Sequence, residues 1–300
     1  MSGIRLGVVG LGAVAQAVHL PLVQRRWDLF DLVAVADLSA GQRDAIGDRL
    51  GIPPERRHAS VGELIAAGGV DAILLLSSGS HGGPALAAIQ AGIPVFCEKP
   101  LALSLAEADA LAAAEEAAGR PMLLLAYMKE YDPAVRAAAA ELERIGTVRF
   151  AEVEVLHPSG GTQLAYANLR PSPADVDAAT IARLRRLDED AVDRAIGAHT
   201  PPDLRSAYAN LVLGSLVHDI AVLRHLVGPI DRVDDAVLWD GGGEVRSVDI
   251  GGWIGDVRAR LHWHYLPDYP AYRETVALHG DRGSVQLVFT VPYLLNAPTE

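Results

Sequence analysis

The sequence predicts an α/β protein of two domains: a doubly wound parallel sheet, followed by an α/β domain with a large open, mostly antiparallel sheet. Three observations predict this class. Short apolar runs alternate with helix-like stretches over the first part of the chain. Segments in which apolar and polar residues alternate recur between 230 and 293, as in half-exposed strands. Half of the 300 residues are apolar, which is enough to bury two cores.

The first domain is expected over residues 1–127. Continuous apolar runs predict buried strands at 4–9, 32–36, 72–76, 95–97 and 122–127. Helices are expected between them. Two of these helices are opened by capping-box pairs, Ser60 with Glu63 and Ser104 with Glu107. Strands that are apolar on both faces predict a parallel sheet covered by helices.

The second domain is expected over residues 128–300. Asp132 and Pro133 form the N-cap and first turn of a helix that Gly146 ends. A strand follows at 148–156, and the remaining strands come after a mostly helical stretch. The part from about 172 to 205 is expected to be a charged helical insertion in this domain, acting as a lid, an oligomer contact or a solvated cover.

Charge and composition limit the classes of partner. The formal net charge of −12 argues against a nucleic-acid surface and against an anionic membrane surface. Cys97 is the only cysteine, so no internal disulfide forms and a reducing compartment fits. No apolar run reaches membrane-spanning length and no signal-peptide cleavage pattern follows the N-terminus. A soluble cytoplasmic protein with a small-molecule partner is therefore expected.

The segment GLGAVA at residues 10–15 follows a strand and opens a helix. Its G-x-G-x-x-A spacing is typical of a Rossmann dinucleotide site: Gly10 permits a tight turn, Gly12 lets the backbone approach a pyrophosphate, and Ala15 lets helix pack on strand. Asp37 ends the second strand, where a carboxylate accepts from both ribose hydroxyls and repels a 2′-phosphate. NAD is therefore expected rather than NADP. The alternative is a tight turn that binds nothing. The cofactor contacts expected from this motif are Gly10, Gly12, Ala13, Val14, Ala15 and Asp37.

Lysine occurs only at Lys99 and Lys129, among 26 lysines and arginines. A partly buried lysine can release its proton, whereas arginine stays protonated. Lys99 lies in VFCEKPLA, residues 95–102, at the carboxyl end of a predicted strand, where open parallel sheets bind ligands. Burial beside a positive nicotinamide would lower its pKa, so that it could serve as a base for a hydroxyl or polarise a carbonyl in reverse. The alternative is an ion pair with Glu98 or another surface carboxylate.

The tripeptide Glu98-Lys99-Pro100, with His81 upstream and the glycine motif, resembles the glucose–fructose oxidoreductase, inositol dehydrogenase and rhizopine catabolism family (Gfo/Idh/MocA). The resemblance is close over residues 4–151 and looser afterwards. It implies a Rossmann domain and an α/β domain with a large open sheet. It also implies that Lys99 contacts the substrate near the nicotinamide and that Pro100 fixes the turn. Further cofactor contacts are then expected at Ser77, Ser78, His81, Glu98 and Lys99.

The resemblance also implies a D-x-x-x-H pattern on a helix of the second domain. His218 fits the histidine, but Gly214 stands at the aspartate position. His218 is expected to act alone as general acid and base, since an unperturbed histidine pKa lies near neutrality. Asp219 is expected to face elsewhere, about 100° around the helix. The alternative for His218 is a core histidine that bonds a backbone carbonyl.

The remaining expectations concern the substrate, metals and assembly. Gly214 leaves room for a bulkier substrate or a neighbouring side chain. His262 and His264 share a strand face without a third ligand, so no metal site is expected. An exposed sheet face predicts a homo-oligomer, a dimer or tetramer formed through the C-terminal sheet. The candidate substrate contacts are Lys129, Tyr166, Arg205, Tyr208 and Asn210, with an exposed loop position as the alternative for Lys129.

The sequence thus predicts an NAD-dependent oxidoreductase, with NADP the less favoured cofactor. Hydride would pass between nicotinamide and a hydroxyl or ketone carbon of a sugar, cyclitol or nucleotide sugar, with Lys99 and His218 handling the proton. One alternative is an imine or enone reductase of the same family. The other is a non-catalytic dinucleotide-binding sensor or partner protein. Gly214 leaves that alternative open, whereas the retained Lys99 and His218 argue against it.

Overall fold

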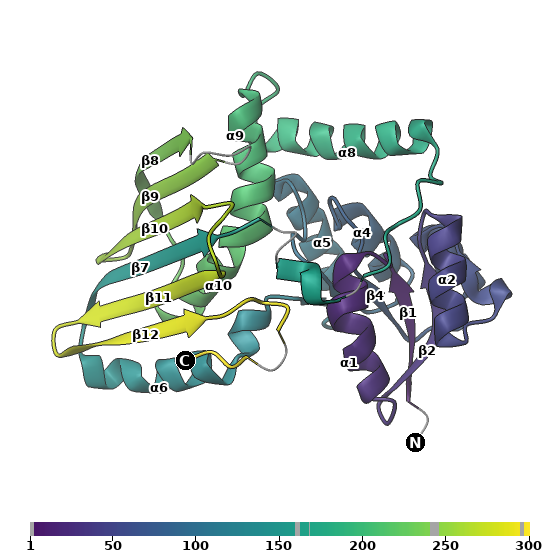
Figure 1. Ribbon diagram of the computed structural model, residues 1–300, viewed down its shortest axis with the longest axis horizontal. Helices are drawn as coiled ribbons and strands as arrows, with labels where there is room; N and C mark the ends of the chain where they lie inside the picture. The colour runs from purple at the N-terminus through teal and green to yellow at the C-terminus, as the bar shows by residue number, and fades with distance from the viewer. Residues whose placement is uncertain (1–2, 160–162, 168, 241–245, 295–296) are drawn as a thin grey trace. The chain divides into compact units, whose positions relative to one another are not determined.

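The computed structural model describes all residues except 1–2, 160–162, 168, 241–245 and 295–296. The chain divides into two compact units (Figure 1). The first unit holds Met1–Ala126 and Leu169–Arg205, and the second holds Tyr127–Asn168 and Ser206–Glu300. The segment 172–205, expected within the second domain, therefore lies in the first unit. The reason is that this segment hydrogen-bonds within the first unit, to Gly41 in the helix after the second strand and to Ser80 in the loop after the fourth strand.

Six strands among the described residues of the first unit form a parallel sheet in the order β3-β2-β1-β4-β5-β6. They are β1 (Ile4–Val9), β2 (Phe30–Ala36), β3 (Arg57–His58), β4 (Ala72–Leu75), β5 (Val95–Cys97) and β6 (Leu123–Leu125). All five predicted strands are present, so the parallel sheet is confirmed. Two-residue β3 is too short to give a sequence pattern. The chain order reverses between β1 and β4, which is where open α/β sheets bind ligands.

Helices surround this sheet (Figure 1). Serine side chains cap three of them: Ser39 Oγ accepts from the Gln42 N–H at 3.0 Å, and Ser60 and Ser104 accept from the N–H groups of Glu63 and Glu107. Both predicted serine caps are therefore present, and the two glutamates accept from the N–H group of the residue before each cap. The helical elements are η1 (Ala15–His19), α1 (Leu20–Arg25), α2 (Ala40–Leu50), η2 (Pro54–Arg56), α3 (Val61–Ala67), α4 (Gly82–Gln90), α5 (Leu105–Ala118), α8 (Ala178–Ile196) and α9 (Pro202–Ser206).

The core of the first unit has two parts, one on each face of the sheet. Ile73 and Leu75 of β4 belong to the apolar cluster that includes α3, α4 and α5. Leu74 and Leu76 belong to the cluster that includes α1 and α2. Because successive strand residues point to opposite faces, a strand buried on both faces is apolar throughout, as the sequence predicted.

The second unit is built on a mixed sheet in the order β12-β11-β7-β10-β9-β8 among its described residues. Only the β7–β10 pair is parallel in this part of the structure, so the predicted mostly antiparallel sheet is confirmed. The strands are β7 (Val148–His157), β8 (Arg232–Asp240), β9 (Arg246–Ile254), β10 (Val257–Tyr265), β11 (Arg273–Gly280) and β12 (Gly283–Phe289). Its helical elements are η3 (Met128–Tyr131), α6 (Pro133–Ile145), η4 (Ala165–Ala167), η5 (Ala207–Leu216) and α10 (Val217–Leu226).

Among the described residues, one helical segment, the 25 residues Pro202–Leu226, is long and apolar enough to cross a membrane by length and composition alone. The expectation that no apolar segment reaches this length is therefore corrected. A core helix passes the same test, and part of this segment belongs to the apolar core of the second unit. Those core residues are Leu211, Leu216, Val222, Leu223 and Leu226.

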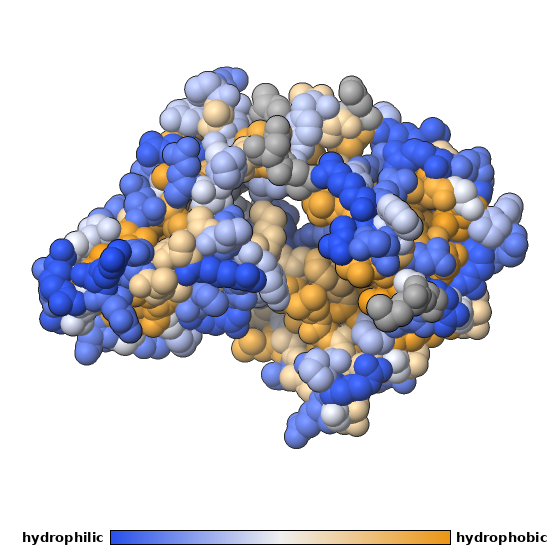
Figure 2. All heavy atoms as spheres, turned by 90° about the horizontal axis from the view of Figure 1, so that it is seen from below, coloured by the Kyte–Doolittle hydropathy of each residue, from blue (hydrophilic) through white to orange (hydrophobic). Residues whose placement is uncertain are grey.

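The face of the molecule in Figure 2 mixes hydrophilic and hydrophobic areas. This pattern fits the composition, in which half of the residues are apolar and about a fifth are charged.

Candidate active site

The glycine loop joins β1 to η1, as the spacing GLGAVA predicts. Gly10 has a φ of +89°, and a Cβ there would lie 2.5 Å from the backbone nitrogen of Ser77. Only glycine fits this position. At Gly12 a Cβ would meet no atom within 4 Å, so the backbone is open to the close approach of a large anion. Ala15 is fully buried. Ala13 is exposed and Val14 is partly buried.

Two glutamines that the sequence reasoning missed hold the glycine loop in place. The side-chain amides of Gln16 and Gln42 both donate to the carbonyl oxygen of Leu11, at 3.0 and 2.7 Å. Both side chains are buried. Buried amides that satisfy a loop carbonyl stabilise one conformation of that loop. Gln16 was within reach of sequence reasoning because it directly follows the motif, whereas Gln42 reaches the loop from α2.

Asp37 ends β2 and bonds the same loop. Its Oδ2 accepts from the Leu11 N–H at 2.8 Å, and its Oδ1 accepts from the Ser39 N–H at 2.9 Å. Each carboxylate oxygen has a second lone pair, so these bonds leave acceptor capacity for ribose hydroxyls. Gly10, Gly12 and Asp37 thus provide the turn, the open backbone and the ribose acceptor that a dinucleotide needs.

The loop after β4 begins with Ser77, whose backbone touches Gly10, and continues with the exposed Ser78. His81 follows and is 1% exposed. Its Nε2 lies 2.7 Å from the Ser77 carbonyl oxygen, and its Nδ1 lies 2.6 Å from the Pro100 carbonyl oxygen. Backbone groups therefore engage both ring nitrogens of this expected cofactor contact. The imidazole links the loop after β4 to the turn after β5.

Glu98 and Lys99 follow β5, as the sequence predicted. Glu98 Oε1 lies 2.8 Å from Nε2 of His19, and its Oε2 accepts from the Lys99 N–H at 3.1 Å. Burial alone would raise the pKa of Glu98, but the hydrogen bond and charge of His19, with the Lys99 contacts, hold this pKa below its ordinary value. His19 was not predicted, because it lies 79 positions from Glu98 in the chain and no local pattern connects them.

Lys99 is partly buried, and the peptide bond to Pro100 is cis. Burial lowers the pKa of the Lys99 ammonium from its ordinary value of 10.5, while the charge of Glu98 opposes this. A lysine with a lowered pKa more readily gives up and regains a proton near neutral pH. The first unit therefore places a potential acid–base group at the carboxyl edge of the sheet that carries the glycine loop and Asp37.

In the second unit, His218 lies in the first turn of α10 and is partly buried. It follows η5, a π-helix that contains Gly214. π-Helical turns inside α-helical segments are frequent at functional sites. A Cβ at Gly214 would meet only the carbonyl oxygen of Ala209, at 3.6 Å, which is an ordinary contact. The position of the missing aspartate can therefore hold a side chain.

Lys129 is buried, with 7% of its side chain exposed, so the alternative of an exposed loop lysine is wrong. Its Nζ lies 3.2 Å from Oδ1 of Asp219 and contacts Glu274 as well. Tyr272 donates to the other oxygen of Glu274 at 2.5 Å. Asp219, expected to face elsewhere than His218, is buried and lies against Lys129. Burial raises the pKa of Asp219, and the charge of Lys129 opposes this.

The other candidate substrate contacts have different partners. The Tyr166 hydroxyl donates to the Tyr293 carbonyl oxygen in the second unit. Arg205 pairs with Asp193 of α8 in the first unit. Tyr208 is partly buried in η5, and the exposed Asn210 donates to the Ser206 hydroxyl one turn earlier, at 3.2 Å. No contact in either unit assigns these residues to a substrate.

The histidine pair on β10 has carboxylate neighbours. The rings of His262 and His264 are stacked, and His262 lies 3.5 Å from Asp249 and 3.7 Å from Glu152. Within the described part of the chain, no group of three or more His, Cys, Asp and Glu side chains could hold a metal ion.

Comparisons with known proteins match the first part of the chain to a family. Residues 4–126 match the family model for the oxidoreductase family with an NAD-binding Rossmann fold, GFO_IDH_MocA. The inositol 2-dehydrogenase of Azotobacter vinelandii is 38% identical over 146 residues, which cover 48% of this chain and 43% of that enzyme. The matched part thus spans less than half the length of this curated relative.

Two solved structures share the fold of nearly the whole chain. The scyllo-inositol dehydrogenase of Lactobacillus casei, with bound NAD(H) and scyllo-inositol, has a TM-score of 0.71 at 19% identity and covers 95% of this chain and 76% of its own. The WlbA dehydrogenase of Bordetella pertussis, in complex with NADH and UDP-GlcNAcA, has a TM-score of 0.71 at 18% identity and covers 99% and 81%. Residues 4–126, which hold the glycine loop and the Glu98-Lys99-Pro100 turn, therefore match the Rossmann domain of the Gfo/Idh/MocA oxidoreductase family.

Proposed function

We propose that this protein is an NAD-dependent dehydrogenase that transfers hydride between nicotinamide and a hydroxyl-bearing carbon of a polyol, sugar or nucleotide sugar. The observation that carries the proposal is Lys99: a partly buried lysine with a lowered pKa, in the same unit as the glycine loop and Asp37. The similarity to an inositol 2-dehydrogenase, and the fold shared with inositol and nucleotide-sugar dehydrogenases, support this substrate class.

In the proposed mechanism, Gly10, Gly12 and Asp37 would hold the dinucleotide, whose nicotinamide would supply the acceptor for the hydride that leaves the substrate carbon. The neutral Lys99 amine would take the proton of the substrate hydroxyl, and the hydroxyl oxygen would form the carbonyl double bond. In reverse, the Lys99 ammonium donates the proton to the carbonyl oxygen. The role of His218, in the second unit, as an acid–base group stays a prediction.

NAD is proposed over NADP because of Asp37. A carboxylate at the ribose position accepts from both hydroxyls of NAD and repels the 2′-phosphate of NADP. The residue that follows, Leu38, provides no positive charge for such a phosphate. The cytoplasmic location expected from the sequence stays a prediction.

The test is the near-ultraviolet absorbance of reduced nicotinamide, followed with purified protein, NAD⁺ or NADP⁺, and a panel of cyclitols, sugars and nucleotide sugars. Lys99→Met is measured alongside. We expect turnover with NAD⁺ that the variant loses, while the variant still binds NADH. Tight NADH binding without turnover on a panel that also includes imines and enones would favour the sensor alternative. Failure to bind either dinucleotide would refute the proposal.

The expected homo-oligomer is a separate proposal that rests on the sheet of the second unit. Ion pairs join strands of this sheet, from Arg258 of β10 to Asp234 of β8 at 2.6 Å and from Arg260 of β10 to Asp249 of β9 at 2.8 Å. Such ordered, paired charges can form a complementary face for a second copy. Light scattering on the purified protein should show a dimer or tetramer, and a monomer at micromolar concentration would contradict this.

A further inference from the structure

Residues Leu169–Asp188, which we call the strap, lie along the carboxyl edge of the parallel sheet in the first unit. Three hydrogen bonds anchor the strap to the segments that follow β1, β2 and β4, namely η1, the first turn of α2 and the loop before α4. They join Arg170 N to Gln16 Oε1 at 3.3 Å, Gly41 N to Asp175 Oδ2 at 2.7 Å, and Ser80 N to Asp188 Oδ1 at 3.0 Å. These segments border the edge where a Rossmann sheet binds its dinucleotide. The strap therefore brings side chains from a distant part of the sequence to that edge.

Asp175 is the strap residue that lies next to the first turn of α2. Its carboxylate accepts from the Gly41 N–H and bonds the hydroxyl of Ser39, the N-cap residue of α2. The bond with the Ser39 hydroxyl, and after it the bond with the Gly41 N–H, lower the pKa of Asp175, so the carboxylate is charged at neutral pH. A Cβ at Gly41 would lie 3.0 Å from Cγ of Pro173, which shows how closely the strap approaches the helix.

This position is the one that a 2′-phosphate would occupy. Asp37 immediately precedes the first turn of α2 and is the proposed ribose acceptor, so a phosphate on the ribose 2′-oxygen would extend past Asp37 towards α2. Helix N–H groups and nearby arginine are the donors that such a phosphate uses. Arg43 lies in this region, with Nη1 2.6 Å from the Asp37 carbonyl oxygen. Asp175 already engages Ser39 and Gly41 and adds a negative charge.

We propose that Asp175 is a cofactor-specificity residue that excludes 2′-phosphorylated dinucleotides from this protein. The proposal rests on the proposed function, because it concerns the choice between the two nicotinamide dinucleotides. Asp37 discriminates through the ribose hydroxyls. Asp175 discriminates by occupying the donors that would bind the phosphate and by repelling its charge. Arg43 alone therefore does not create an NADP site.

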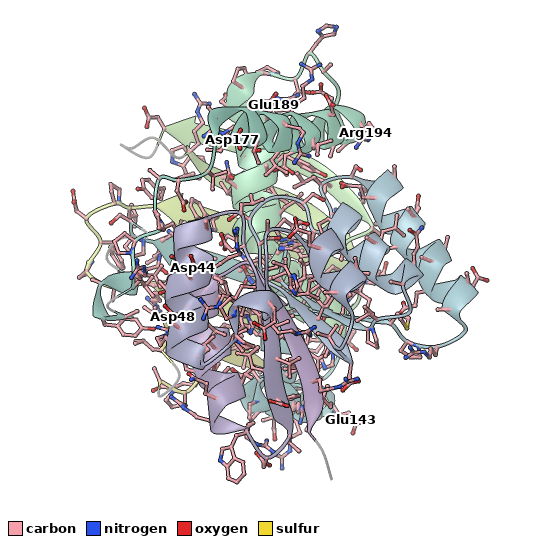
Figure 3. All side chains as sticks on the ribbon, turned by 90° about the vertical axis from the view of Figure 1, so that its right-hand side faces the viewer. Asp44, Asp48, Glu143, Asp177, Glu189 and Arg194 are labelled. Carbon is pink, nitrogen blue, oxygen red and sulfur yellow. The ribbon has the colours of Figure 1, made fainter. Side chains whose placement is uncertain are left out.

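Asp175 also caps α2 from outside the helix. The choice of variant separates this structural role from the specificity role. Asp175→Asn keeps an oxygen that can accept from the Gly41 N–H and removes only the charge. Asp177→Asn is the matched control. Asp177 lies two residues further along the strap, caps α8 through the Thr180 N–H at 2.8 Å, and carries the same charge (Figure 3). The two variants thus have equal net charge and each keeps a potential cap.

The measurement is the dissociation constant of NADP⁺ and of NAD⁺ by titration calorimetry, for the wild type and both variants. We expect Asp175→Asn to bind NADP⁺ about three- to tenfold more tightly than the wild type, since it loses one exposed like charge close to the phosphate. NAD⁺ affinity should change by less than about twofold, because NAD⁺ has no 2′-phosphate. The gain should shrink in about 0.5 M salt, where exposed charges are screened within a few ångströms.

Each outcome decides one question. An unchanged ratio of NADP⁺ to NAD⁺ affinity in Asp175→Asn, with NAD⁺ still bound, would overturn the specificity role and leave the proposed dehydrogenase intact. An equal gain in Asp177→Asn would also overturn it, because the effect would then come from the charge of the strap as a whole. A wild type that binds neither dinucleotide would refute the proposed function itself.

Discussion

Lys129 and Asp219 form an ion pair inside the second unit, with 3.2 Å between Nζ and Oδ1 and with 7% and 1% of the two side chains exposed. The residues are 90 positions apart in the sequence. Glu274 contacts the same ammonium, and the Lys129 ammonium also lies 4.7 Å from the centre of the Phe289 ring. One lysine thus compensates two buried carboxyl groups beside the helix that carries His218.

Lys129→Met should destabilise the protein by about 3–5 kcal/mol, because it leaves buried carboxyl groups without their cation. Urea unfolding measures this change. The control is Arg224→Met, which breaks the more exposed Arg224–Glu130 pair of 3.0 Å and should cost less than about 1 kcal/mol. Equal small losses in both variants would contradict the structural role of Lys129.

Gly10→Ala and Gly12→Ala should fail in different ways. At Gly10 the positive φ and the Ser77 backbone exclude a Cβ, so the free energy of unfolding should fall by about 1–3 kcal/mol. At Gly12 no atom lies within 4 Å of the added Cβ, so stability should be close to that of the wild type while NADH binding weakens. Urea unfolding and NADH fluorescence titration distinguish the two. Wild-type NADH affinity in Gly12→Ala would argue against the pyrophosphate at this loop.

Lys99 should titrate below its ordinary pKa of 10.5, because burial disfavours the ammonium. NMR of protein labelled at the lysine side chains measures this directly, because the chain has only two lysines and Lys129→Met identifies the other signal. Glu98→Gln should lower the Lys99 pKa further, since the Glu98 charge raises it. A rise in Glu98→Gln would contradict this assignment.

The lowered pKa of Lys99 should also make the stability of the protein depend on pH. Folding favours the neutral Lys99 amine, so the free energy of unfolding should rise with pH between the folded pKa and 10.5, and this contribution should be absent in Lys99→Met. The comparison of wild type and Lys99→Met by urea unfolding across this pH range checks the sign. A contribution that falls as pH rises would mean that folding stabilises the ammonium instead.

Gly214→Asp should fold, because a side chain at this position makes only an ordinary contact with Ala209. We expect the free energy of unfolding to change by less than about 1 kcal/mol. If the carboxylate one turn before His218 is the missing part of the family pattern, hydride transfer should become faster in this variant and not in the control Gly214→Ala. Slower turnover in Gly214→Asp alone would indicate that the natural substrate occupies this space.

Local patterns in the sequence were sufficient to predict the strands of the Rossmann unit and its phosphate loop. The five apolar runs predicted five buried strands, because a strand covered on both faces has no polar side to display. Gly10 and Asp37 were predictable because a turn with positive φ and a strand-end carboxylate each leave a short, characteristic pattern. The Ser60–Glu63 and Ser104–Glu107 pairs were visible because caps act over three residues.

Tertiary structure alone decided the partners that lie far apart in the chain. His19 meets Glu98, Lys129 meets Asp219, and Asp175 reaches Gly41 only after strands and helices have packed. No periodicity in the sequence encodes such pairs, since each depends on loop paths set by the whole sheet. The position of the strap was not predictable for the same reason. The sequence by itself therefore determined the elements and the cofactor motif, and packing determined which charges they bring together.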